Sequence, residues 1–270
     1  MVQTRQDICI YVCALQRCAK SPTTENIPRL SKVCRWIRRV PSFIRYECLE
    51  GPVKILTIAD SAFRKEDSSG LAMKGAIIGI AEHRDSAKTV CDPGGRLHAI
   101  DWYSRRQRRI ARSTFAAELH SLVDGVEVAK VVLQAMLEIT SAVPLQPAQI
   151  MRILDSPQER EVNILVCTDC KSLFDTLSVE DVKAPNENAL IMLLLSVKES
   201  LQTGLISKMY WIDTRDMLAD ALNKGVVARS ALLVAGKTGK WLLQFPSKVH
   251  VEKVLRTITT ASEEVAAHMK

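Results

Sequence analysis

Apolar residues in this chain alternate between short β-branched runs and longer stretches with helical spacing. Runs of the first kind, bounded by turn residues, predict strands, whereas apolar residues three and four positions apart predict amphipathic helices. The strand pattern occurs at residues 53–59, 71–81, 97–103, 162–167 and 206–212. The first three runs are joined by loops, which predicts an antiparallel meander, and the fourth lacks polar alternation, which predicts a strand buried on both faces. We therefore expect an α/β fold with a mixed five-stranded sheet flanked by helices.

Helical spacing is clearest after Ser113, a residue type that favours the helix N-cap. From Phe115 to Met136 the apolar residues follow one stripe. Glu118 lies on the buried flank of that stripe, where a carboxylate needs a partner. Other helices are expected at residues 28–40, 172–177 and 189–201 and within 226–270, and an irregular connection is expected at 143–158.

Two of the predicted strands end on an aspartate. Asp60 follows the first strand run, and Asp169 follows the fourth. A carboxylate at the end of a buried strand is costly to desolvate unless it is paired or coordinates a metal. Together with Glu118 and Asp220, these residues predict a four-carboxylate site with no lysine between the acids. All-oxygen ligands select hard divalent cations, here Mg²⁺ or Mn²⁺.

Each of these acids also has a plainer interpretation. Asp60 would be a turn residue, Asp169 a cap of the following helix, and Asp220 an exposed helix acid. Asp213 and Asp216 compete with Asp220 for the fourth position. Asp220 is expected to lie furthest from the other acids, because the last helix is the least constrained element. The order of the four acids along a strand–helix alternation favours one shared site.

The net charge of +7 favours polyanionic partners. Residues 1–50 hold nine basic and four acidic side chains, and the predicted helix at 28–40 carries basic residues opposite its apolar stripe. A second cluster, the arginine run, holds five arginines in eight positions: Arg105, Arg106, Arg108, Arg109 and Arg112. Both surfaces are either solvated faces or contacts to nucleic-acid phosphates without sequence readout.

Cysteine and histidine patterns do not predict a competing site. Eight cysteines are scattered without regular spacing and no secretory leader is recognisable, which predicts reduced thiols in an intracellular protein, cytoplasmic or nuclear. Cys167 and Cys170 have the spacing of a metal or redox pair, but no second pair follows and the five histidines lack ligand spacing. No apolar run approaches the ~18 residues of a membrane span, so no membrane partner is expected.

Several stretches, in this order, resemble the ribonuclease H domain at the C-terminal end of reverse transcriptases from copia-type retrotransposons. The resemblance extends over roughly residues 20–245. The stretches are SPT at 21–23, RWIRR at 35–39, ADSAF at 59–63, WYSRRQ at 102–107, STFAAEL at 113–119, TDCKS at 168–172, WI at 211–212 and MLADALNK at 217–224.

The resemblance implies a ribonuclease-H-like domain at residues 51–225. Residues 1–50 would then be a basic connection segment left from the region after the polymerase, and 226–270 a helical basic tail. By the same resemblance, Asp60 bridges two Mg²⁺ or Mn²⁺ ions, Glu118 and Asp169 complete the site on one ion, and Asp220 serves the other. The implied reaction is endonucleolytic cleavage of the RNA strand in an RNA–DNA hybrid, and the implied partners are that hybrid and the polymerase part of the same polyprotein.

The chain also departs from this family. It has no Tyr-x-Asp-Asp polymerase signature, so the resemblance implies a fragment of a larger polyprotein. No histidine occurs between His120 and His250, where cellular ribonucleases H often carry one before the last acidic helix. Two alternatives therefore stay open: another metal nuclease on the same fold, such as an integrase or resolvase, and a catalytically inactive retroelement remnant that at most binds nucleic acid.

Overall fold

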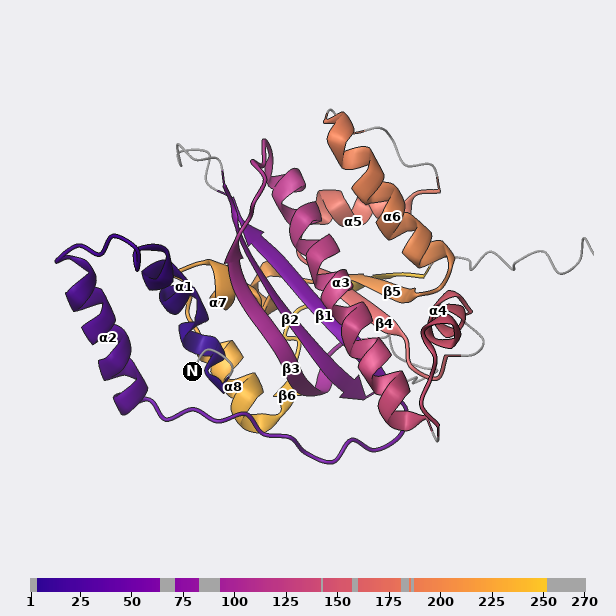
Figure 1. The fold of residues 1–270 in the computed structure, drawn as a ribbon, viewed down its shortest axis with the longest axis horizontal. Helices are drawn as coiled ribbons and strands as arrows, with labels where there is room; N and C mark the ends of the chain where they lie inside the picture. The colour runs from indigo at the N-terminus through magenta and orange to yellow at the C-terminus, as the bar shows by residue number, and fades with distance from the viewer. Residues whose placement is uncertain are drawn as a thin grey trace, which may run out of the picture.

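A mixed sheet with helices on both faces forms the centre of the protein (Figure 1). The computed structural model describes residues 4–63, 71–82, 93–141, 143–156, 160–180, 185 and 187–251. Within these residues the sheet has seven strands in the order β6-β3-β2-β1-β4-β5-β7. The predicted α/β class and mixed sheet are confirmed, whereas the predicted number of five strands is wrong.

The five central strands follow the predicted segments. They are β1 (Val53–Ala62), β2 (Met73–Glu82), β3 (Gly95–Arg106), β4 (Ile164–Thr168) and β5 (Ile206–Trp211). The first three pair as an antiparallel meander. β4 is parallel to β1, and β5 is parallel to β4. The carboxyl ends of β1, β4 and β5 therefore meet at one edge of the sheet.

The two additional strands come from the segment that was expected to be a helical tail. Helix α8 (Ser230–Thr238) ends at Gly239, which adopts a left-handed conformation with φ of 63°. Strand β6 (Lys240–Trp241) then pairs with β3, and β7 (Lys248–His250) pairs with β5. Runs of two or three residues are too short to show a strand period, so the sequence pattern could not reveal them.

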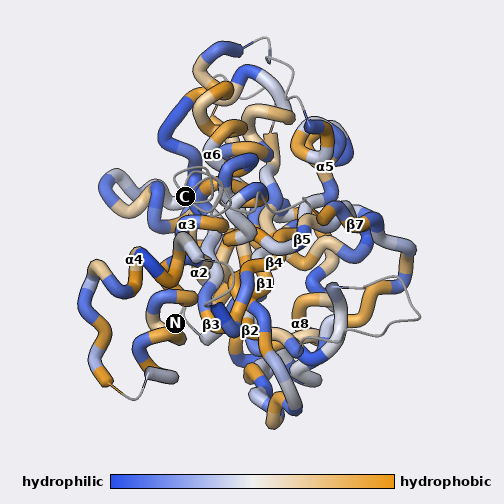
Figure 2. Tube along the Cα trace, turned by 90° about the vertical axis from the view of Figure 1, so that its right-hand side faces the viewer, coloured by the Kyte–Doolittle hydropathy of each residue, from blue (hydrophilic) through white to orange (hydrophobic). Residues whose placement is uncertain are grey.

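Helices cover the two faces of the sheet unequally. One face packs against α3 (Thr114–Thr140), α5 (Lys171–Ser178) and α6 (Ile191–Gln202). The other packs against α1 (Cys9–Arg17), the short α7 (Asp220–Asn223) and α8. Alternate residues of β1 supply both cores: Ile55 and Ala59 face the first group of helices, and Leu56 and Ile58 face the second. Hydrophobic positions accordingly gather inside the molecule (Figure 2).

The segment 143–158, expected to be irregular, contains helix α4 (Pro147–Asp155). Pro147 is the first helical residue, and Gln146 and Gln149 form a reciprocal capping box. Proline is well tolerated at this position because its missing N–H would have no helical partner there. The proline that suggested an irregular connection therefore begins a helix.

The N-terminal segment contacts the sheet through its first turn and α1. Ile8 and Cys9 are buried there. The carboxylate of Asp7 accepts hydrogen bonds from Arg5 and from the indole of Trp36 in α2 (Asn26–Arg39). No residue of α2 is buried, so its apolar stripe borders an open groove against α1 and residues 225–229. Among the described residues, no helix is both long and apolar enough for a membrane span.

Candidate functional site

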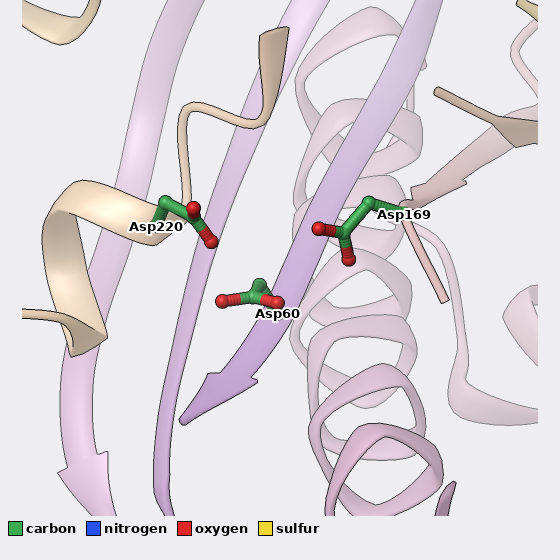
Figure 3. Close-up of side chains that lie close together, drawn as sticks. All are labelled: Asp60, Asp169 and Asp220. Carbon is green, nitrogen blue, oxygen red and sulfur yellow. The ribbon is translucent and has the colours of Figure 1, made fainter. Parts of the chain in front are cut away.

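Asp60 and Asp169 occupy equivalent positions on two adjacent strands. The parallel register pairs Ile58 of β1 with Cys167 of β4, so each aspartate lies two residues beyond a paired position. Side chains two residues apart in a strand share a face. Both carboxylates therefore project from the same edge and the same face of the sheet, and Figure 3 shows them directed towards one another.

Helix α7 brings Asp220 to this pair. It packs so closely on β2 that a Cβ added to Gly75 would lie 2.8 Å from the Cβ of Leu222 and 3.1 Å from the carbonyl oxygen of Ala219. Glycine at position 75 thus allows the helix to approach the strand beside Asp60. As a result, one carboxylate oxygen from each of Asp60, Asp169 and Asp220 lies within 4.8 Å of the others.

Glu118 reaches the same edge from the opposite side of the sheet. The hydroxyl of Ser113 caps α3 by accepting from the amide of Ala116, which fixes the start of the helix at Thr114, four residues before Glu118. The backbone amide of Ser61 donates to Oε1 of Glu118 at 3.3 Å. Oε2 is buried and has no hydrogen-bond partner among the described residues. Glu118 is outside the group of three aspartates but lines a cavity of about 500 Å³ together with Asp60 and Asp169.

The expectation that Asp220 lies furthest from the other acids is therefore wrong. Asp220 belongs to the close group and is only 6% exposed, whereas Glu118 is the outer member. The close packing at Gly75 explains the difference, because it constrains a helix that appeared free in the sequence. We call the four residues the carboxylate cluster.

The two competitors of Asp220 have structural roles elsewhere. Asp213 caps the turn that follows β5 and forms a salt bridge with Arg215 at 2.8 Å. Asp216 is buried, and its carboxylate accepts from the amides of Gln244 and Phe245. Its hydrogen bonds tie the segment after β6 to the sheet, so neither aspartate is available to the cluster.

A lysine lies among the four acids, contrary to the expectation of an uninterrupted acidic site. The ammonium of Lys224 is 3.2 Å from Oδ2 of Asp60 and also pairs with the carboxylate of Asp220. Next to it, the Asn223 amide donates to Oδ2 of Asp60 at 2.6 Å. Asn223 and Lys224 follow Asp220 by three and four residues. The spacing of four indicates only the pair of Lys224 with Asp220, whereas the contacts of both residues with Asp60 depend on how α7 packs against the sheet.

Burial and mutual repulsion favour the protonated forms of Asp60, Glu118 and Asp169. The pKa of Asp60 is raised well above its ordinary value, first by burial and then by the charges of Glu118 and Asp169. Burial, with a contribution from Asp169, raises the pKa of Glu118 to about 8. Burial also raises the pKa of Asp169, against the opposing effects of Thr214 and Lys224. A cation that binds these carboxylates must therefore displace protons as well as water.

The pKa of Lys224 is raised despite the opposing effect of burial. Burial is the largest single influence and favours the neutral amine, but the carboxylates of Asp60, Asp220 and Asp169 together outweigh it. The ammonium thus stays charged and offsets part of the negative charge of the cluster.

The arginine run begins at the same edge of the sheet. Strand pairing aligns Ala62 of β1, Met73 of β2 and Arg106 of β3 in one row. With strands about 4.8 Å apart, the run starts about 10 Å from the end of β1. Gln107 and Ala111 are buried and anchor the loop, while Arg105, Arg108, Arg109 and Arg112 are exposed and Arg106 is half-buried.

No metal group that includes cysteine or histidine occurs in the part of the chain that the structure describes. Cys167 is buried in the sheet and Cys170 borders the cavity, and both are free thiols. His83 and His268 lie outside the described residues. The acidic group of Asp60, Asp169 and Asp220 is thus the arrangement that can hold a metal ion, through carboxylate oxygens.

No protein-family model and no curated protein matches the chain. The geometry of the cavity and the sequence motifs around it therefore carry the functional argument.

Proposed function

We propose that this protein is a metal-dependent endonuclease of the ribonuclease H type that cleaves the RNA strand of an RNA–DNA hybrid. One observation carries the proposal: Asp60 and Asp169 lie near the carboxyl ends of two adjacent parallel strands, Asp220 converges with them from one face of the sheet, and Glu118 reaches the cavity beside them from the other face. Support also comes from the motifs around these acids, which resemble those of copia-type ribonuclease H domains in residue type and order.

The residues of the cavity fit hard divalent cations, for which we propose two ions of Mg²⁺ or Mn²⁺. All four side chains of the carboxylate cluster offer oxygen, the ligand that these ions prefer. Within the described parts of the chain, the buried Oε2 of Glu118 has no hydrogen-bond partner, which is unfavourable unless a ligand supplies one. When bound at carboxylates of this kind, paired divalent ions activate water and stabilise the leaving oxygen in phosphodiester hydrolysis.

The protein side chains would position the ligands and the substrate. Asn223 holds the carboxylate of Asp60 through a 2.6 Å hydrogen bond, and the Ser61 amide holds that of Glu118. The arginine run would hold phosphates of either strand from the neighbouring edge, without reading bases. Recognition of a hybrid would then rest on groove shape and 2′-hydroxyls.

A second candidate is a retroelement remnant that folds and binds nucleic acid but cleaves nothing. The salt bridges of Lys224 favour it, because they partly neutralise Asp60 and Asp220 without any metal. A cluster stabilised in this way can persist in a folded protein that has no catalytic role.

A hybrid-cleavage assay on the purified protein separates these candidates. The substrates are a hybrid labelled on its RNA strand, single-stranded RNA, and duplex DNA, each with Mg²⁺, with Mn²⁺ and with a chelator. We expect internal cleavage of RNA in the hybrid alone, dependent on either metal.

The double variant Asp60→Asn, Asp169→Asn, purified in parallel, controls for a contaminating host nuclease. Equal cleavage by this variant would assign the activity to the contaminant. Absence of cleavage by the wild-type protein, combined with absence of stabilisation by either metal, would leave the remnant as the better description.

A further inference from the structure

The side chain of Lys224 has a position that the carboxylate cluster alone does not explain. Its ammonium contacts Asp60 and Asp220, two of the three aspartates whose carboxylates converge. Among the described residues that line this cavity, Lys224 is the one cation. A divalent ion bound between Asp60 and Asp220 would need the same oxygens and would repel the ammonium at short range.

The side chain has room to leave. The side chain of Lys224 is 29% exposed, compared with 1% for the side chain of Asp60 and 8% for that of Asp220. It follows the last residue of α7 and has an extended backbone, so it is not held in a helical turn. A lysine has four rotatable side-chain bonds and keeps its charged end near water when it can. The ammonium can therefore exchange Asp60 for another anion at the cavity without a change in the fold.

We infer that Lys224 is the internal counter-ion of the metal-free cavity and that divalent cations displace it towards a phosphate of the bound nucleic acid. The carboxylates that bring the lysine in are those that a metal would use, and the substrate is a polyanion that must enter a cavity whose described lining holds three acids, Asp60, Glu118 and Asp169, and one cation. This inference rests on the metal binding in the proposed function. Lys224 would be a positioning residue in the free protein and a substrate contact in the complex.

The first test measures Mg²⁺ affinity by calorimetry, independently of cleavage, for wild type and Lys224→Met. Methionine keeps the length and apolar stem but removes the competing charge. Coupling between two linked binding events on one protein is typically about 5- to 150-fold, and removal of a competing charge at the site itself should have an effect at least as large. We therefore expect Mg²⁺ to bind Lys224→Met at least about fivefold more tightly than wild type. Lys171→Met is the control, because Lys171 is exposed and lies two residues from Asp169. Its affinity should equal that of wild type.

Unchanged or weaker Mg²⁺ binding by Lys224→Met would overturn the inference, because the lysine would then be a neutral bystander or would hold the aspartates in place for the metal. Absence of Mg²⁺ binding in both proteins would overturn it together with the proposed metal site. Mg²⁺ binding that follows the expected pattern in a wild-type protein that cleaves nothing would support the inference while rejecting the nuclease.

The second test concerns the substrate contact. Loss of one charged contact to a phosphate should raise KM for the hybrid about tenfold in Lys224→Met at saturating Mg²⁺, with a smaller change in kcat. Lys224→Arg keeps the charge, so its KM should lie close to the wild-type value. A fall in kcat at unchanged KM, not restored by arginine, would contradict the transfer of Lys224 to the substrate.

Discussion

The carboxylate cluster and the arginine run lie at the same edge of the sheet but differ in their exposure to solvent. Three of the four acids are nearly or fully buried, and their charges are held by the Ser61 amide, Asn223 and Lys224. In the described part of the chain the arginines form no ion pair, and their closest aromatic contact is Arg105 over Tyr103 at 4.7 Å. Because the carboxylate cluster is buried, replacing a single atom in it should change cleavage strongly. Binding of the hybrid by the exposed arginine run should instead depend on how many of its charges are present.

The strongest test of this difference is Asp169→Asn. It keeps the size of the side chain but removes one metal ligand, so we expect hybrid cleavage to fall by about 10³-fold or more. Without metal, thermal stability should hold or rise, because the pKa of Asp169 is raised by burial and the neutral amide avoids that desolvation. Asp175→Asn, at an exposed position of α5, should change neither property. A large loss of stability in Asp169→Asn would indicate a structural role instead.

Binding of the hybrid by the arginine run should depend on the salt concentration. A variant with alanine at Arg105, Arg106, Arg108 and Arg109 should bind the hybrid more weakly, and the log–log salt slope should become shallower by roughly 0.9 for each lost phosphate contact. The control replaces Arg29, Arg35, Arg38 and Arg39 of α2 with alanine, which changes the net charge equally. If both variants lose the same slope, overall charge and not the arginine run decides binding.

Packing behind the carboxylate cluster should matter more than exposed charge for stability. Gly75→Ala forces a Cβ against Leu222 and Ala219, and overpacking of this kind costs about 1–3 kcal/mol of unfolding free energy. Cleavage should also fall, because α7 carries Asp220. Gly236→Ala is the matched control, since its nearest neighbour would be at 3.7 Å and alanine favours a helix. Denaturant unfolding measures the free energy of unfolding of both variants. Equal values would show that α7 can move away from residue 75 without loss of stability.

Per unit of pH, the smallest expected effect is on the stability of the metal-free protein. The pKa of Glu118 is raised from 4.5 to about 8. Between these values the folded state binds a proton that the unfolded state has released, so stability is highest below the lower value and is lost as pH rises through the window. The slope is at most about 1.4 kcal/mol per pH unit for one proton. Glu118→Gln should flatten this slope of stability against pH. A wild-type protein whose metal-free stability rises from pH 5 to 8 would contradict the raised pKa of Glu118.

Some features of the site could be predicted from the sequence because they depend on local patterns. Apolar runs that end on Asp60 and Asp169 predicted strand-end acids, and the helical stripe around Glu118 predicted a buried carboxylate. The burial of Asp60 and Glu118 follows the predicted patterns, although β1 continues for two residues beyond Asp60, since burial of a strand or a helix face is set by the period of its own residues.

The remainder depended on contacts between distant segments. The position of Asp220 was decided by the absence of a side chain at Gly75, more than a hundred residues earlier, and the sequence spacing of neither residue shows it. The strands β6 and β7 were equally hidden, because a few residues become a strand only when a sheet edge is there to pair with them. The amino-acid sequence thus determined which acids would be buried at element ends, and the tertiary packing decided that a lysine, Lys224, would lie among them.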